Sequence, residues 1–271
     1  MPPPPTPAAP APGRAPDAGA SRDAGLRPDA GSRADAGASA DGGSRPDAGS
    51  TPKKLLQLTF DDGPLDDTIV RGGSVAALNR ILAELKARGV KAAFFVLGQE
   101  VQTKPSAVQL ILDGDHVVGN HSFTHLGKSG GDTDKLLLTT AGQKTIQDEF
   151  EKTHDVVAKF VTMKHWRAPR LEGIDGIWKI FQASPKLKGY FSHSDSHVDS
   201  LDSQRVAAKE QMLADFLSSQ AEIGLKRADL GSRKSVRVLF HVKNSTAESL
   251  NYVLEGLLKD GYALTDFEQD S

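Results

Sequence analysis

Two adjacent carboxylates, Asp61 and Asp62, are the first residues in the chain whose types and spacing suggest chemistry. They follow the mostly apolar run 55–58, and Gly63 and Pro64 come directly after them. Such a run is typical of a buried strand that ends in a turn. Two carboxylates side by side at the end of a buried strand are costly unless a positive charge lies next to them. A bound metal ion is the simplest source of that charge.

Two histidines further along the chain could supply more metal ligands. His121 and His125 are four residues apart and follow the strand-like run 116–119. On a helical turn this spacing places both imidazoles on one face. One carboxylate and two imidazoles form a ligand set that leaves positions open for water and substrate. Each pattern alone also has a structural explanation, because Asp-Asp-Gly-Pro is a common turn and a histidine pair can be satisfied within a helix.

The composition argues against several classes of function. The chain has 271 residues and a net charge of -2, which suggests neither a nucleic-acid partner nor an anionic membrane. It has no cysteine, so we expect no disulfide and no thiolate metal site. No apolar stretch of about 18 residues is present, so we expect no transmembrane helix. No secretory signal peptide is visible after Met1.

Residues 1–52 differ from the rest of the chain. They consist mostly of Pro, Ala, Gly, Ser, Asp and Arg, and an Asp-Ala-Gly pattern repeats every six residues from Asp17. A β-helix with this period would need an aliphatic side chain in each turn, which is missing here. We therefore predict a disordered, low-complexity tether over residues 1–52, which holds the following domain away from an anchor or surface. Residues 53–271 have a globular composition and form the second predicted domain.

Strand-like runs alternate with helical periodicity throughout residues 53–271. The patterns predict strands near 55–60, 92–96, 116–119, 161–166, 236–240 and 262–265, with a short apolar run at 190–191. They predict helices near 78–85, 105–112, 146–160, 174–181, 206–220 and 245–258. Ser245 and Glu248 form a possible capping box for the last helix. This alternation predicts a parallel sheet covered by helices.

The polar clusters of this region all lie just past the ends of predicted strands. They are Asp61-Asp62, His121 with His125, Arg167, the stretch 195–202, and His241. In a (β/α) barrel the active site gathers at the carboxyl ends of the strands. We therefore predict an α/β fold, a distorted (β/α) barrel of about seven strands.

The order of these motifs resembles the polysaccharide deacetylases, the NodB homology domains of carbohydrate esterase family 4. The resemblance covers about residues 53–266. It rests on Thr-Phe-Asp-Asp-Gly-Pro, His-Ser-x-x-His, Arg-x-Pro and Leu-x-His, in that order. The first two motifs together are specific, whereas either of the last two alone would be weak.

The resemblance implies a role for each matching residue at the first two motifs. Asp61 would be the general base that deprotonates the attacking water. Asp62 would bind a single divalent metal together with His121 and His125. The metal is usually zinc in this family, with cobalt or nickel often accepted. Successive side chains on a strand point to opposite faces, so one aspartate could bind metal while the other acts as base.

The later motifs imply the remaining roles. Arg167 would pair with Asp61, and His241 would be the general acid that protonates the leaving amine. Pro169 and the backbone N–H of Arg170 would lie at the oxyanion. A further aspartate would tune the histidine. Asp199 matches best for that role, and the alternatives are Asp195, Asp202 or a plain solvated loop.

Several positions depart from the family pattern. Arg170 stands where an aromatic residue is common, the fourth motif lacks its tryptophan, and the segment 65–73 is longer than usual. As a hypothesis, Arg170 favours an anionic or otherwise unusual glycan. His193 and His197 are interpreted as loop residues, with a place at the metal or substrate as the alternative. Trp166 and Trp178 are interpreted as packing residues rather than sugar platforms.

The implied activity is metal-dependent hydrolysis of N-acetyl groups on a carbohydrate, an N-acetylglucosamine-containing polysaccharide of the cell envelope. An amide requires an activated nucleophile, stabilisation of the oxyanion and protonation of the leaving amine, and the motifs offer a group for each need. An O-acetyl esterase with the same site and a non-catalytic carbohydrate-binding domain are the alternatives. We expect a monomer that is secreted or tethered to the cell envelope.

Overall fold

The structure of the protein, a computed structural model, describes residues 55–64, 75–126, 133–169, 173–202, 209–217 and 235–267. The predicted tether, residues 1–52, lies outside these ranges. So do Arg170 and the long segment 65–73. Among the described residues, no helix is both long and apolar enough to cross a bilayer.

The described strands form one parallel sheet of seven strands. They are β1 (Leu55–Gly63), β2 (Ala93–Val96), β3 (Val117–Asn120), β4 (His165–Trp166), β5 (Val198–Asp199), β6 (Ser235–His241) and β7 (Ala263–Leu264). Their order is β4-β3-β2-β1-β6-β5, and β7 pairs with the beginning of β1. The parallel sheet predicted from the sequence is confirmed, with β1 at its centre.

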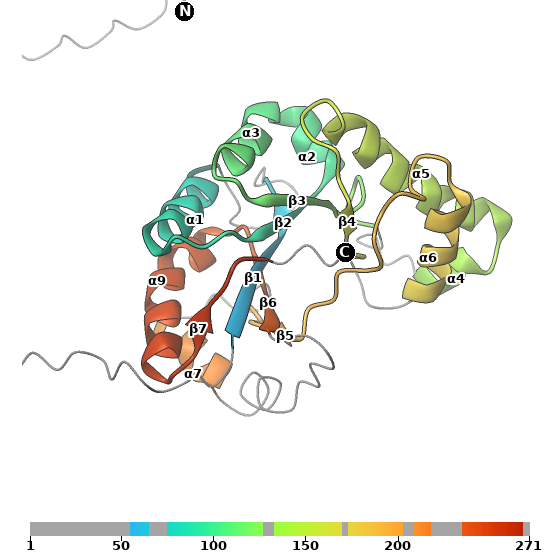
Figure 1. Ribbon diagram of the computed structural model, residues 1–271. Coiled ribbons are helices and arrows are strands. Elements are labelled where there is room, and N and C mark those ends of the chain that lie inside the picture. The colour runs from blue at the N-terminus through green and yellow to red at the C-terminus, as the bar shows by residue number, and fades with distance from the viewer. Residues whose placement is uncertain are drawn as a thin grey trace, which may run out of the picture. The chain divides into compact units, whose positions relative to one another are not determined.

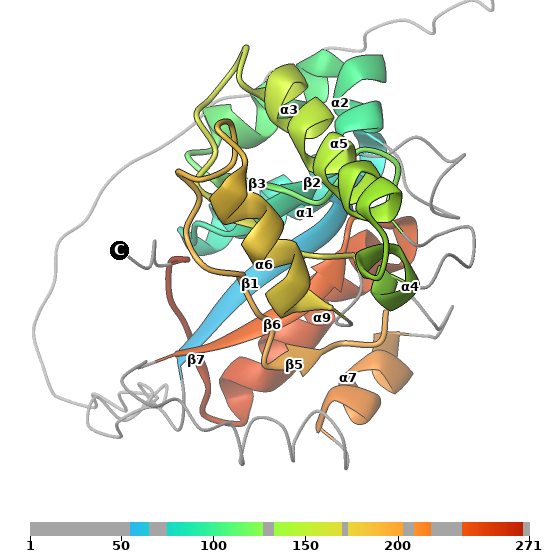
Figure 2. The same cartoon turned by 90° about the vertical axis from the view of Figure 1, so that its right-hand side faces the viewer.

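Helices cover the outer face of the curved sheet (Figure 1). They are α1 (Val75–Arg88), α2 (Gly98–Thr103), α3 (Pro105–Asp113), α4 (Thr133–Leu137), α5 (Thr140–Val157), α6 (Ile174–Ala183), α7 (Lys209–Leu217) and α9 (Asn244–Lys259). Helices α5 and α6 pack against each other on one side of the molecule (Figure 2). The predicted helices are therefore present, within the residues that are described.

The predicted capping box of the last helix is wrong. Helix α9 begins at Asn244, its N-cap residue is Lys243, and no side chain caps it. Ser245 lies inside the first turn, two residues beyond the N-cap position. A capping side chain must come from the residue that precedes the helix.

Residues 191–200, which are irregular except for β5, link the two edges of the sheet. The residues described here include no direct pairing of β4 with β5, so the strands alone leave the barrel open. Four backbone hydrogen bonds hold this segment at its two ends. At the β4 end, Phe191 N–H donates to the carbonyl oxygen of Lys164, the residue before β4 (2.8 Å), and Ser194 N–H donates to Trp166 O (2.9 Å). At the β6 end, His197 N–H donates to Arg237 O (2.9 Å) and Ser200 N–H donates to Leu239 O (3.0 Å). The run 190–191 is thus not a strand, although Phe191 bonds to the residue just before β4.

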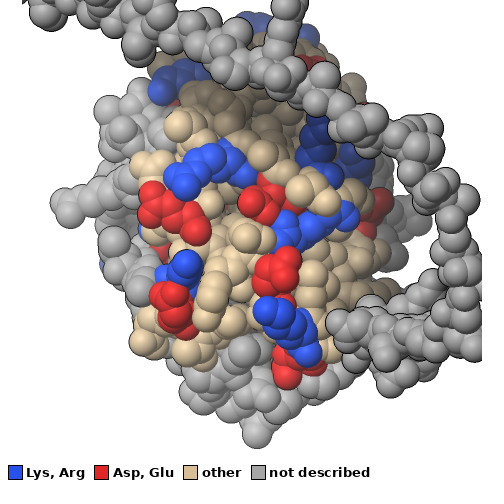
Figure 3. Space-filling model, turned by 90° about the vertical axis from the view of Figure 1, so that its left-hand side faces the viewer, with Lys and Arg blue, Asp and Glu red and all other residues tan. Residues whose placement is uncertain are grey.

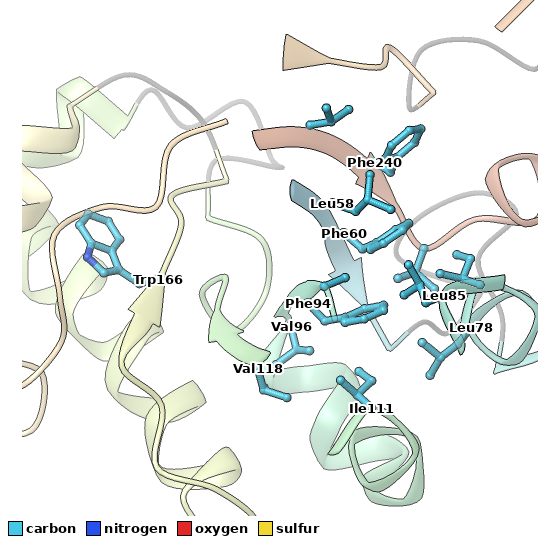
Figure 4. Close-up of a cluster of buried hydrophobic side chains, with 14 of the residues drawn as sticks. Leu58, Phe60, Leu78, Leu85, Phe94, Val96, Ile111, Val118, Trp166 and Phe240 are labelled. Carbon is cyan, nitrogen blue, oxygen red and sulfur yellow. The ribbon is translucent and has the colours of Figure 1, made fainter. Parts of the chain in front are cut away.

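The main core lies between the sheet and its helices. Leu56, Leu58 and Phe60 of β1 are fully buried. The ring of Phe60 stacks on Phe94 (centroids 5.0 Å apart) and on Phe240 (5.7 Å), its register partners on the two flanking strands (Figure 4). Because side chains alternate along a strand, this places the intervening residues of β1 on the inner face of the sheet.

The inner face carries a second, smaller apolar cluster. It consists of Ala93, Phe95 and Phe267, with Val117 packed against it. The C-terminal segment is held there by a hydrogen bond from Phe267 N–H to Lys91 O (2.8 Å). Ala93 and Phe95 flank Phe94 along β2, so this cluster lies on the face of the sheet opposite the main core.

Charges of both signs are interspersed on the side of the molecule that carries α1 and α9 (Figure 3). Ion pairs join the two helices there: Arg88 lies 3.4 Å from Glu255, and Arg80 lies 3.6 Å from Glu248. This face presents no block of a single charge. Pairs of this kind, exposed to solvent, contribute little to stability.

Candidate active site

A bulge at the end of β1 directs both aspartates into one site. The register between β1 and β2 shifts between Asp61 and Gly63, and Asp62 has a φ of 62°. As a result, Nε2 of His121 lies 3.6 Å from Asp61 Oδ2 and 3.5 Å from Asp62 Oδ1. The expectation that the two side chains point to opposite faces is therefore wrong. Simple alternation fails here because a bulge re-aims a side chain.

His121 and His125 lie on an irregular loop rather than on a helical turn. Ser122 and His125 have positive φ angles of 70° and 64°. Local side chains take the backbone N–H groups that a helix would use, because Asn120 Oδ1 accepts from Ser122 N–H (3.0 Å) and Ser122 Oγ accepts from Leu126 N–H (2.9 Å). Such side-chain bonds compete with helix formation. The two imidazoles still converge, with ring centroids 5.5 Å apart.

Asp62, His121 and His125 fit a metal ion. One ligand atom from each lies within 4.8 Å of the others, and Nε2 of His125 lies 3.4 Å from Asp62 Oδ1. Nδ1 of His121 lies 2.9 Å from the carbonyl oxygen of Arg167, which can only accept. The proton of a neutral His121 ring is therefore on Nδ1, and the Nε2 lone pair faces Asp62.

The carboxylate of Asp62 supports the same interpretation. Its Oδ1 is buried and has no hydrogen-bond partner in the described part of the chain. Burial by itself would raise the pKa of Asp62, but the imidazoles of His121, His241 and His125 outweigh burial and hold that pKa well below its usual value. A buried anionic oxygen without a hydrogen bond, facing two imidazole nitrogens, is what a divalent cation would satisfy.

Asp61 is paired with Arg167, as the family resemblance implies. Nη1 of Arg167 donates to Asp61 Oδ1 (2.8 Å) and to Thr59 Oγ1 (2.9 Å), and its Nε donates to Ser194 O (2.7 Å). The guanidinium lies over the ring of Phe95, 4.2 Å from its centroid. Both charged groups are buried. Sequence reasoning did not identify Thr59 or Phe95, although Thr59 begins the first motif.

His241 is held by Asp202 rather than by Asp199. Nδ1 of His241 lies 2.7 Å from Asp202 Oδ1, and its backbone N–H donates to Oδ2 (2.8 Å). The hydroxyl of Thr246 donates to the same Oδ2 (2.6 Å). Burial lowers the pKa of His241, but the Asp202 carboxylate outweighs burial and raises that pKa to about 9. The ring is therefore protonated at neutral pH.

The assignment of this role to Asp199 is thus corrected. Asp199 ends β5, is exposed to solvent, and accepts a hydrogen bond from Leu201 N–H (2.8 Å). Leu201 has a φ of 60°, so the chain turns there and brings Asp202 back to the end of β6. The sequence left both aspartates open, because a turn of this kind at a leucine gives no clear signal.

His193 supports the backbone next to Arg167. Its Nε2 accepts from Ala168 N–H (2.9 Å), and its Nδ1 lies 2.6 Å from Asp195 Oδ1. His197 instead accepts from the backbone N–H of Arg237 (2.9 Å). Neither histidine belongs to the metal cluster that the described residues form. A place for either histidine at the substrate stays a prediction.

Three further residues named in the sequence analysis are Trp166, Pro169 and Arg170. Trp166 is fully buried and stacks on Phe181, with centroids 4.3 Å apart, which confirms that Trp166 is a packing residue. Pro169 is partly buried and ends a described range, and Arg170 follows it outside the described residues. The predicted roles of Pro169 and Arg170 at the oxyanion therefore stay predictions.

Comparison with known proteins matches this arrangement to a family. The family model for polysaccharide deacetylase matches residues 48–183, about half of the chain. The chain belongs to the polysaccharide deacetylase family. The match includes β1 with its two aspartates, the histidine loop and Arg167. His241 and Asp202 lie beyond it.

Several relatives of this chain are named as peptidoglycan deacetylases. The chain is 26% identical over 222 residues to the peptidoglycan-N-acetylmuramic acid deacetylase PdaA of Bacillus subtilis, covering 80% of this chain and 71% of that protein. It is 35% identical over 107 residues to the peptidoglycan-N-acetylmuramic acid deacetylase PdaC of the same organism. That second match covers 40% of this chain and only 19% of PdaC.

A solved structure confirms the fold. A mutant of BA3943, a CE4 family pseudoenzyme with restored enzymatic activity, has a TM-score of 0.57 to this chain at 25% identity. The match covers 80% of this chain and 67% of that one. The wild-type BA3943 comes from Bacillus anthracis.

Proposed function

We propose that this polysaccharide deacetylase is a metal-dependent hydrolase that removes N-acetyl groups from peptidoglycan. The observation that carries the proposal is the convergence of three groups at the carboxyl ends of the strands. The possible metal ligands Asp62, His121 and His125 lie beside the Asp61–Arg167 pair, and Asp61 is the register partner of His241. Base, metal ligands and acid therefore surround one small volume.

The proposed roles follow from these positions. A divalent metal bound at the three ligands would supply the Lewis acidity that makes water nucleophilic near neutral pH. Asp61, oriented by Arg167, accepts the proton of the attacking water. His241 is protonated at neutral pH because Asp202 faces it, so it can donate a proton to the leaving nitrogen. Without that proton an amine leaves poorly.

The substrate class is inferred from the relatives. PdaA and PdaC are named as deacetylases of N-acetylmuramic acid in peptidoglycan, and a Listeria monocytogenes relative, PgdA, is named as a deacetylase of its N-acetylglucosamine. Because the match to PdaC covers only a fifth of that protein, we propose peptidoglycan as the polymer and leave the choice of sugar to experiment. Such a substrate would place the protein outside the cell or in its envelope.

The test is acetate release from purified peptidoglycan and from N-acetylglucosamine oligomers, with added zinc and with chelator. We expect release that chelator abolishes and zinc restores. Asp61→Asn should bind zinc and release acetate far more slowly, which separates the base from the metal ligands. Faster release from acetylated xylan would instead favour an O-acetyl esterase, whose better leaving group depends less on His241.

A non-catalytic carbohydrate-binding domain is the second candidate, and the pseudoenzyme relative is the observation that favours it. Asp61, Asp62, His121, His125 and His241 are all present here, which favours catalysis. The same assay distinguishes the two functions. Binding to peptidoglycan without release of acetate from any of these substrates, in zinc-loaded protein, would support the binding domain.

A further inference from the structure

We propose that Glu149 of α5 is a positioning residue for the metal ligands, because its carboxylate fixes the backbone between His121 and His125. Oε2 of Glu149 accepts from the backbone N–H of Phe123 (3.0 Å) and of Thr124 (2.8 Å). Its Oε1 accepts from the hydroxyl of Thr124 (3.1 Å). A single carboxylate from a neighbouring helix thus accepts three hydrogen bonds from the loop. Hydrogen bonds to an ionised acceptor are stronger than those between neutral groups.

The loop needs such support because its backbone is strained at two positions. Ser122 and His125 both have φ angles in the left-handed region, which side-chain-bearing residues rarely adopt. Conformations of this kind persist only when the surrounding structure holds them. One of the two strained residues is itself a proposed metal ligand, so the position of its imidazole depends on the backbone of the loop.

Glu149 shares the support of the loop with other contacts. The hydroxyl of Ser122 accepts from Leu126 N–H (2.9 Å), after His125. The carbonyl groups of Ser122 and Phe123 accept from the N–H groups of Gly98 (3.1 Å) and Gln99 (3.0 Å), at the start of α2. These bonds fix the first half of the loop. The N–H groups that precede His125 bond instead to Glu149.

The two histidines also differ in how their rings are held. His121 has an outer partner, a hydrogen-bond partner on the ring nitrogen that does not face Asp62. Its Nδ1 donates to the carbonyl oxygen of Arg167. Nδ1 of His125 is buried and has no hydrogen-bond partner in the ranges that the structure describes. Metal-binding histidines normally receive their orientation from such a partner. For His125 we infer that Glu149 takes over this function through the backbone of the loop.

This inference rests on the proposed function, because it needs the metal site. It is tested by titrating zinc against a chromophoric chelator that competes for the metal, in the full chain. Glu149→Ala should weaken zinc binding by about 10–100-fold, the usual effect of losing an outer partner. Glu149→Gln should stay within about threefold of the original protein, since the amide oxygen can still accept both N–H groups.

Glu151 offers a matched control on the same helix. Its Oε1 accepts from Ser184 Oγ (2.6 Å) and from Gln147 Nε2 (2.7 Å), away from the loop. Glu151→Ala therefore removes a comparable carboxylate and should leave the zinc affinity unchanged. Equal weakening in both alanine variants, or no weakening in Glu149→Ala, would overturn the role of Glu149.

Two further outcomes are distinguishable. If Glu149→Ala does not fold, Glu149→Asp replaces it, because the carboxylate is then one methylene too short to reach the loop. Glu149→Asp should weaken zinc binding, and an unchanged affinity would refute the proposal. An unsubstituted protein that binds no zinc would refute the proposed function together with this inference, whereas tight binding that is insensitive to Glu149 would refute this inference alone.

Discussion

Asp202 holds His241 at two points, through the ring Nδ1 at 2.7 Å and through the backbone N–H at 2.8 Å. Thr246 donates to the same carboxylate, and the buried Lys243 donates to the backbone carbonyl of Asp202 (2.8 Å). The aspartate is thus fixed by the turn that leads from β6 into α9. It orients the ring and favours its protonated form.

Removing this carboxylate should shift the pH dependence of activity. The acid form of His241 is needed, and its pKa of about 9 predicts that kcat/KM falls as the pH rises through about 9. In Asp202→Asn the opposing charge is lost, so the pKa of His241 falls and the alkaline limb moves to lower pH. A pH–rate profile measures this shift. Asp199→Asn is the control, and a shift of equal size there would contradict the assignment to Asp202.

Asp61→Asn and Asp62→Asn should have different effects, although the two residues are adjacent. Asp62 faces both imidazoles, so its substitution should lower the zinc affinity. Loss of a residue that hydrogen-bonds to a metal ligand usually costs roughly 10–100-fold, and loss of a ligand itself should cost at least as much. Asp61 faces Arg167, so its substitution should keep zinc and lower kcat by about 10²–10⁴-fold. Zinc titration and steady-state kinetics on both variants check this. Identical behaviour of the two would show that the aspartates do not divide the work.

Stability should depend on pH through His116, far from the metal ligands. Burial, and then the nearby charge of Lys91, lower the pKa of His116 from 6.5 to about 4, and its Nδ1 accepts from Ala92 N–H (3.1 Å). The folded protein therefore keeps this ring neutral while the unfolded chain takes up a proton. The stabilisation is fully present above about pH 6.5 and is lost as the pH falls toward 4.

His116→Asn isolates this effect, because the amide oxygen can still accept the Ala92 N–H and the residue no longer titrates. Denaturant unfolding of the chelated protein between pH 4.5 and 8 measures the free energy of unfolding. We expect a smaller loss of stability on acidification in the variant than in the original protein. Parallel curves would mean that His116 does not contribute to the acid sensitivity.

Gly119 leaves room for the ring that supports Arg167. A Cβ at this position would lie 2.6 Å from Cδ1 of Phe95, and the Phe95 ring packs under the guanidinium. Gly119→Ala should cost about 1–3 kcal/mol of stability, as overpacking does, and should lower kcat by displacing Arg167. Gly189→Ala is the control, because its Cβ would meet only Lys164 Nζ, at 3.7 Å. Equal stability of the two variants would contradict the prediction.

The sequence by itself determined the parallel sheet, most of the helices and the motif residues. Hydrophobic periodicity reports which face of an element is buried, and the order of strands and helices restricts the connections between them. The position of Asp61, His121 and Arg167 just past predicted strands was enough to place them at one edge of the sheet. Their motif spacing was enough to suggest the metal ligands.

Tertiary structure alone decided how these residues face one another. The bulge at Asp62, the left-handed turns at Ser122 and Leu201, and the choice of Asp202 over Asp199 depend on backbone angles that these residue types do not signal. Phe95 and Glu149 join the site from other parts of the chain, and Thr59 of the first motif meets the distant Arg167, through contacts that no local pattern encodes. Sequence patterns report burial and local propensity, whereas these contacts depend on which distant segments meet when the core packs.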